Sequence, residues 1–214
     1  MTITELSTAI RRKYNAVSDS FFSDEEITFL IWEACLDLAR ESECIEAVYS
    51  SSTVASQQEY DYPTSAIGIK RIQYAGKKLK LITMRDDDAI TGSNQSTTET
   101  GTPQYYFIFK EVIYLRPLPS AVGTLKIWTF NEPQQLTTTS TLEIPTQFHM
   151  DLSNYVVSEM AAKDLNFTTA QFYLSKWEKS KIAAKRWQQK RRRSDSFASV
   201  QDEEASIETY LGTV

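Results

Sequence analysis

Histidine, cysteine, glycine and proline are scarce in this chain of 214 residues, and their scarcity narrows what the protein can be. A transition-metal site needs about three His or Cys ligands. One histidine, His149, and two cysteines can hardly supply them. The cysteines, Cys35 and Cys44, form no CxxC pair, and we expect free thiols rather than a disulfide. The sequence therefore predicts neither a metal site nor a cofactor.

Long apolar runs are missing as well. No stretch approaches the roughly 20 apolar residues that cross a bilayer, so we expect no membrane contact. The first fifteen residues, MTITELSTAIRRKYN, lack the apolar core of a signal peptide. We therefore expect the protein to be made and kept in the cytoplasm.

Motifs for catalysis are also absent. The sequence contains no GxGxxG, no P-loop and no GxSxG, which leaves nucleotide and acyl-transfer chemistry without support. His149 lies beside the apolar Phe148 with no nucleophile motif, and a structural role is expected for it. The densest carboxylate cluster, Asp86 to Asp88, is expected to be solvated surface. The sequence predicts no enzyme and no catalytic residue.

Charge is present but unevenly distributed. The net charge is −5, yet residues 170–193 carry nine bases and one acid, whereas residues 1–60 and 195–214 are strongly acidic. Such segregation favours docking between unlike surfaces. Two alternatives stay open: the basic stretch meets acidic segments of its own chain, or it contacts nucleic-acid phosphates. The residues predicted to bind a partner are Lys185, Arg186, Trp187, Lys190, Arg191, Arg192, Arg193, Tyr210 and Leu211.

Hydrophobic periodicity predicts helices at both ends of the chain. Residues 4–15 form a short helix with Thr4 as its cap, and Ser23 caps a second helix over residues 24–42. After Pro145 a helix carries Phe148, Leu152, Tyr155, Val156 and Met160 on one face. A long helix over residues 170–193 makes its apolar contacts through Phe172, Tyr173, Trp177, Ala184 and Trp187.

The middle of the chain alternates with a period of two, as strands do. Hairpins are predicted around Ala75-Gly76 and around Lys110-Glu111, and Pro117 and Pro119 are expected to end pairing after the second. Further strands are expected in residues 45–63 and 124–130, and one helical turn in 83–90. Residues 91–102 are expected to be a mobile polar loop.

These elements together predict an α+β fold. The N- and C-terminal helices, in residues 1–44 and 145–193, pack as a bundle. Residues 45–144 form a β-rich insertion, a small sandwich or barrel. Residues 195–214 form an extended acidic tail that does not fold alone.

Several segments, in order, carry a family resemblance. LARESECIEA (38–47) is followed by QEYDYP (58–63), IKRIQYAGKKLKLIT (69–83), MRDDDA (84–89), GTPQYYFIFKEVIYLRPLP (101–119) and EIPTQFHMDLSNYVVSEMAAKD (143–164). Over roughly residues 25–190 this order resembles the head-to-tail connector, or adaptor, proteins of tailed bacteriophages, including the tail tubular protein A type.

The resemblance implies a virion protein of the neck or tail, assembled in the host cytoplasm and without enzymatic activity. Such proteins form a ring, commonly of twelve subunits, between the portal and the tail. The implied partners are further copies of the chain, the portal protein and a tail (nozzle or tube) protein, with DNA passing through the channel without sequence-specific binding. The alternatives are another neck or tail protein, such as a terminator or stopper, and a DNA-binding protein that uses the basic helix.

The charge map adds an expectation about the ring. Its subunits should meet through unlike faces, and the acidic N-terminal helices and the basic C-terminal helix are the candidate faces.

Overall fold

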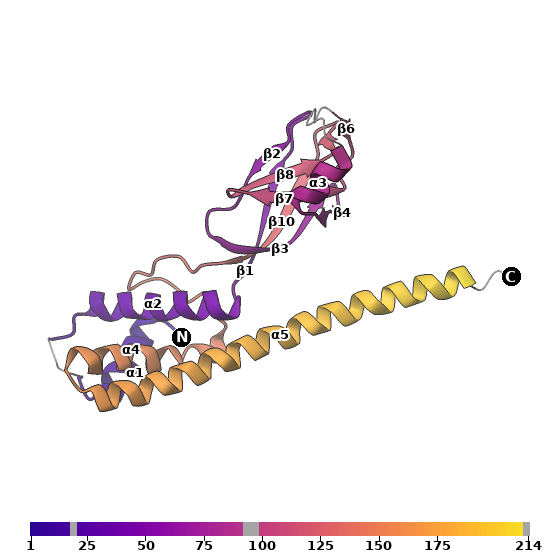
Figure 1. Cartoon of the computed structure of the whole chain (residues 1–214). Helices are drawn as coiled ribbons and strands as arrows, with labels where there is room; N and C mark the ends of the chain where they lie inside the picture. The colour runs from indigo at the N-terminus through magenta and orange to yellow at the C-terminus, as the bar shows by residue number, and fades with distance from the viewer. Residues whose placement is uncertain (18–20, 92–98, 212–214) are drawn as a thin grey trace. The chain divides into compact units, whose positions relative to one another are not determined.

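The computed structural model describes the backbone of residues 1–17, 21–91 and 99–211, and the side chains of these ranges except 90–91 and 193–211 (Figure 1). The chain divides into two compact units, Met1–Ile45 with Pro133–Val214 and Glu46–Glu132. The first is helical and the second is built of strands, which confirms the predicted α+β class.

The helical unit contains α1 (Ile3–Tyr14), α2 (Asp24–Ser42), the short 3-10 turn η1 (Thr146–Phe148), α4 (Leu152–Lys163) and α5 (Phe167–Leu211). Helix α1 begins earlier than predicted because Thr2, not Thr4, is its cap: Thr2 Oγ1 accepts from the Glu5 backbone N–H at 3.2 Å, and Glu5 Oε2 accepts from the Thr2 N–H at 2.8 Å. Helix α2 has the predicted bounds, with Ser23 Oγ accepting from the Glu26 N–H.

Helix α4 is the centre of this unit. Eight of its 12 residues are buried, and α1, α2 and α5 all pack on it (Figure 1). From α5, Trp177 and Ala184 are fully buried, as predicted. Phe172, however, is 54% exposed, so its assignment to the core was wrong. Five residues separate it from Trp177, which turns the two side chains about 140° apart on a helix.

Helix α5 also corrects the prediction of an extended tail, because its backbone stays helical through Leu211. Between Phe167 and Leu211 the sequence contains neither glycine nor proline, the residues that most oppose a helix. The acidic composition of residues 195–211 therefore did not stop the helix. Residues 212–214 lie outside the described part of the chain.

The main part of the β unit, among the described residues, is a pair of four-stranded sheets. Their orders are β1-β10-β3-β4 and β2-β8-β7-β5. The strands are β1 (Glu46–Ser52), β2 (Glu59–Asp61), β3 (Ala66–Tyr74), β4 (Lys77–Lys78), β5 (Lys80–Leu81), β7 (Tyr105–Phe109), β8 (Val112–Arg116) and β10 (Thr124–Asn131), with helix α3 (Met84–Thr91) between β5 and β7. Only Leu79 separates β4 from β5, so one extended stretch joins the two sheets along one side. The result is a small barrel that stays open between β1 and β2.

The apolar core of this unit comes from the inward positions of both sheets. Its members are Tyr60, Ile72, Tyr74, Leu79, Tyr106, Ile113, Leu115, Leu125 and Ile127. Both predicted hairpin turns are confirmed: Ala75 and Gly76 have φ of 47° and 81°, and Lys110 and Glu111 have φ of 48° and 59°. Two-residue hairpins need such positive φ values to match the strand twist.

Pro117 and Pro119 behave differently from the prediction. Pairing with β7 does end at Arg116, but Leu118–Pro119 forms β9, which runs parallel to β6 (Thr100–Gly101). The N–H groups used are those of Leu118, bonded to the Glu99 carbonyl at 3.0 Å, and Ser120, bonded to the Gly101 carbonyl at 2.9 Å. The prolines occupy the alternate positions, where no donor is required. The predicted polar loop therefore ends in a strand, and its residues 92–98 lie outside the described part of the chain.

Candidate interaction surfaces

The basic stretch of α5 lies against the acidic side of α2 within one subunit. Lys181 Nζ is 3.1 Å from Asp37 Oδ2, Lys185 Nζ is 2.7 Å from Glu41 Oε1, and Arg192 pairs with Glu43. We call these three pairs the charged seam. Asp37 and Glu41 on α2 are one turn apart and share a helix face, as do Lys181, Lys185 and Arg192 on α5, while Glu43 is the C-cap that follows α2. These pairs bear out the alternative that the basic stretch meets acidic residues of its own chain, while binding of Lys185 and Arg192 to the portal or a neighbouring subunit stays a prediction.

A hydrogen bond between α5 and α2 adds to the ion pairs of the charged seam. Trp177 Nε1 donates to Asp37 Oδ2 at 2.8 Å. Burial acts to lower the pKa of Lys181, but hydrogen bonds to Glu178 and Asp37 outweigh it and the pKa is raised. The seam thus holds α5 in a fixed register on α2 as far as Arg192.

The other predicted contact residues of α5 lie around the seam. Trp187 is half-buried, with its ring 5.7 Å from that of Phe148, and the Arg191 guanidinium lies 4.8 Å above it. Arg186 and Lys190 are exposed. The backbone of Arg193, Tyr210 and Leu211 belongs to α5, but their side chains lie outside the described residues.

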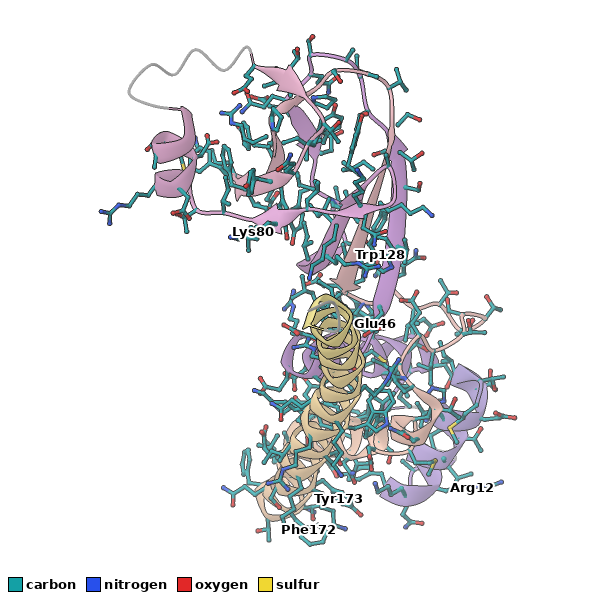
Figure 2. All side chains as sticks on the ribbon, turned by 90° about the vertical axis from the view of Figure 1, so that its right-hand side faces the viewer. Arg12, Glu46, Lys80, Trp128, Phe172 and Tyr173 are labelled. Atoms are coloured by element: carbon teal, nitrogen blue, oxygen red, sulfur yellow. The ribbon has the colours of Figure 1, made fainter. Side chains whose placement is uncertain are left out.

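A second face of α5 points away from α2 and α4, and sequence reasoning missed it. Its residues alternate in steps of three and four, the spacing of one helix face. Phe172, labelled in Figure 2, is 54% exposed. Ile182 is 50% exposed, and Lys176 Nζ lies 4.2 Å above the Phe172 ring. We call this face the outer stripe; it consists of Phe172, Ser175, Lys179, Ile182, Arg186 and Gln189.

Helix α2 carries an aromatic groove on its own outward side. Phe29 is 47% exposed and packs against Trp32, with ring centroids 5.5 Å apart. These rings, Glu25 and residues 135–138 line a pocket of about 400 Å³, which we call the α2 groove. Trp32 Nε1 is buried there without a hydrogen-bond acceptor among the described residues. Buried donors are normally satisfied, so the groove suits a partner that brings an acceptor.

The predicted solvated cluster Asp86 to Asp88 is divided among three roles. Asp87 is buried and binds Arg116 through two contacts of 2.7 and 3.0 Å, which corrects the prediction for that residue. Thr83 caps α3 by accepting from the Asp86 N–H, and the hydrogen bond that the Thr83 backbone N–H donates to the Asp86 carboxylate lowers the pKa of Asp86. Asp88 is exposed as expected. Because the carboxylates point to different partners, they do not converge on one ion; no described group of His, Cys, Asp and Glu is arranged to hold a metal.

His149 and the cysteines are structural. His149 is 6% exposed, and its Nε2 lies 2.7 Å from the Ile144 carbonyl oxygen. This contact connects Ile144 to the segment just before α4. Cys35 and Cys44 are buried free thiols, as expected. Burial raises the pKa of Cys35 to about 12, so its thiolate is scarce at neutral pH.

Two half-buried acids face each other beside the charged seam, Glu33 of α2 and Glu159 of α4. Burial raises the pKa of Glu159, and the negative charge of Glu33 adds to the shift. Burial also raises the pKa of Tyr155 to about 12, with further contributions from the charges of Glu33, Glu159 and Asp37. A second negative charge beside Glu33, on Glu159 or Tyr155, is therefore unfavourable.

This pair gives a pH-dependent prediction. A carboxyl group with a folded pKa above its unfolded value, about 4.3 for Glu, makes folding less favourable at neutral pH. That cost disappears as the pH falls below the unfolded pKa. Glu159→Gln should therefore raise the thermal midpoint at pH 7, with the gain shrinking toward zero near pH 4, in calorimetry against the exposed control Glu25→Gln. An equal gain at both pH values would contradict the assignment.

The family model of the SU10 adaptor protein matches residues 1–201, which include all of the β unit and the helical unit through most of α5. No curated protein matches the sequence. No helix among the described residues combines the length and apolarity needed to span a bilayer.

Proposed function

Since the chain belongs to the SU10 adaptor protein family, a family of structural adaptors of the phage virion, we propose that its subunits form a ring between the portal and the tail. The family match over residues 1–201 is the observation that carries this proposal. The narrower likeness to the tail tubular protein A type, and a count of twelve subunits, rest on the order of sequence segments alone. In this ring, DNA passes through the channel without sequence-specific contacts.

The ring contacts are proposed to join two different faces of the helical unit. The outer stripe of one copy packs into the α2 groove of the next, with Phe172 beside Phe29 and Trp32. Lys179 and Arg186 then approach Glu25. Unlike faces related by a rotation close into a ring, whereas the charged seam is already used inside each subunit.

This contact is tested by a single substitution. Phe172→Ser should weaken association of the purified protein at least tenfold, because it removes the largest apolar side chain of the stripe. The control is Leu165→Ser, which removes a side chain that is 75% exposed but lies off the stripe. Mass photometry across concentration measures the assembly, and wild-type association should also weaken toward 1 M salt, where the Debye length is about 3 Å. Equal assembly of both variants and the wild type would contradict the contact.

The end of α5 is proposed to bind the portal. Residues 195–214 contain five acids and no base, and Ile207 and Leu211 are four residues apart, the separation of neighbours on one helix face. We propose that Tyr210 and Leu211 anchor on the portal while Asp202, Glu203 and Glu204 face basic residues there.

Deleting residues 195–214 separates this role from folding. The buried residues of α5, Trp177 and Ala184, and the charged seam through Arg192 all precede the deletion. The thermal midpoint should therefore stay unchanged while the truncated protein no longer captures the portal in a pull-down. Portal capture at wild-type strength would contradict the assignment.

A further inference from the structure

The barrel of the β unit is open along one side, between β1 and β2. Each of these strands is the last in its sheet and pairs with one neighbour, β1 with β10 and β2 with β8. A groove of about 410 Å³ lies between them, lined by residues 49–52 of β1 and 59–63 of β2 and its continuation. We call this groove the open seam.

The backbone of β1 offers unused pairing groups to the seam. The Thr53 N–H donates to the Gly123 carbonyl at 2.8 Å, which extends the ladder with β10. Donors and acceptors of an antiparallel edge strand alternate in direction. The backbone N–H and C=O groups of Tyr49 and Ser51 therefore point to β10, as those of Thr53 do. The backbone N–H and C=O groups of Val48, Ser50 and Ser52 point away from β10.

Strand β2 presents fewer free-facing backbone N–H and C=O groups to the open seam than β1 does. The Tyr62 N–H bonds to the Glu111 carbonyl and the Gln58 carbonyl accepts from Leu115, so Glu59 and Asp61 point outward by the same alternation. The Glu59 carbonyl already accepts from Gln57 Nε2 at 2.8 Å. Strand β1 is thus the better template for a further strand.

Strand β1 also lacks the usual protection of an edge. Natural edge strands carry lysine, proline or a bulge that prevents stray pairing. The sequence of β1, EAVYSSS, contains neither lysine nor proline, and its register with β10 runs without a shift from Glu46↔Phe130 to Ser52↔Thr124. Such an edge favours pairing with another chain.

On the opposite side of the barrel, the residues that bridge the two sheets show which side chains suit a bridging strand. There, residues 77–81 (KKLKL) bridge the two sheets: β4 pairs with β3 and β5 pairs with β7. Leu79 points into the core and is 2% exposed, while Lys77, Lys78 and Lys80 are exposed (Figure 2 labels Lys80). The open seam is acidic: Glu59 and Asp61 are exposed, and no lysine or arginine is among its described lining residues.

We propose that the open seam is a strand-acceptor site for an extended segment of another virion protein that carries lysine or arginine. The segment pairs with the outward groups of β1, turns one apolar side chain inward beside Tyr49 and Ile127, and places its cations near Glu59 and Asp61. That the donor is a virion protein rests on the proposed function; the strand-accepting property of the seam does not.

A peptide titration tests the seam directly. The probe is the fluorescein-labelled peptide GKKLKLIT, the sequence of residues 76–83, titrated against the full chain by anisotropy. Ser50→Pro removes an outward N–H that β10 does not use, and it should weaken binding at least tenfold; Ser50→Ala keeps that N–H and should bind like the wild type. Glu59→Lys with Asp61→Lys should also weaken binding at least tenfold, whereas the control Asp88→Lys, an exposed acid away from the seam, should not.

Absence of peptide binding by the wild type, or equal binding by Ser50→Pro and by the double charge variant, would overturn the proposal. Hydrogen exchange separates this result from a failure of the proposed function. In the assembled virion, the amides of Val48, Ser50 and Ser52 should exchange at least tenfold more slowly than in the free chain. Unchanged exchange in virions that contain the protein would overturn the strand donor, while absence of the protein from virions would overturn the adaptor function alone.

Discussion

Replacing Trp177 with alanine is expected to lower the free energy of unfolding of the helical unit by about 3–5 kcal/mol. The side chain is fully buried where three helices meet. Its ring lies 5.7 Å from that of Tyr155 on α4, and its Nε1 donates to Asp37 on α2. Truncation leaves a cavity and takes a hydrogen bond from the charged seam, so both effects act in the same direction. Chemical denaturation followed by far-ultraviolet circular dichroism measures the loss.

The matched control is Trp187→Ala on the same helix. Trp187 is only half-buried, so its truncation removes less contact area and should cost clearly less. If Trp177→Ala costs less than about 1 kcal/mol, α5 does not dock on α2 and α4 as described.

Replacing Asp87 with alanine is expected to destabilise the β unit by about 3–5 kcal/mol, the usual cost of leaving one member of a buried ion pair without its partner. The side chains of Asp87 and Arg116 are 9% and 8% exposed, and two hydrogen bonds join them. Without the carboxylate, the guanidinium stays buried without its paired anion. Urea denaturation measures the effect.

Two further variants make this prediction specific. Asp88→Ala changes the exposed neighbour and should alter stability by no more than about 0.5 kcal/mol. Asp87→Leu combined with Arg116→Met removes both charges and should recover much of the loss, since apolar replacements of buried pairs are often well tolerated. Equal stabilities of the Asp87 and Asp88 variants would contradict the buried pair.

Local signals in the sequence were enough to predict individual elements. Ser23 followed by Asp24, Glu25 and Glu26 sets the start of α2, because capping and the helix dipole act within one turn. The two hairpin turns were equally local, since each strand pair flanks two residues. These features depend on neighbours a few residues apart, and such neighbours are visible in a sequence.

Features that depend on distant partners were not predicted. Asp87 was read as surface because its partner Arg116 lies 29 residues away. The partner of Lys185 within its own chain could not be named because Glu41 is 144 residues away, and only the fold brings the two together. The helical backbone of residues 195–211 was missed for another reason: charge composition was weighed above the absence of glycine and proline.

Electron cryomicroscopy of the purified protein mixed with the portal and tail proteins of its phage tests the central claim most directly. We expect a closed ring of this chain between the two, with the outer stripe of each subunit against the α2 groove of the next and the end of α5 on the portal. A chain that binds neither protein, or one that binds the tail as separate subunits without a ring, would contradict it.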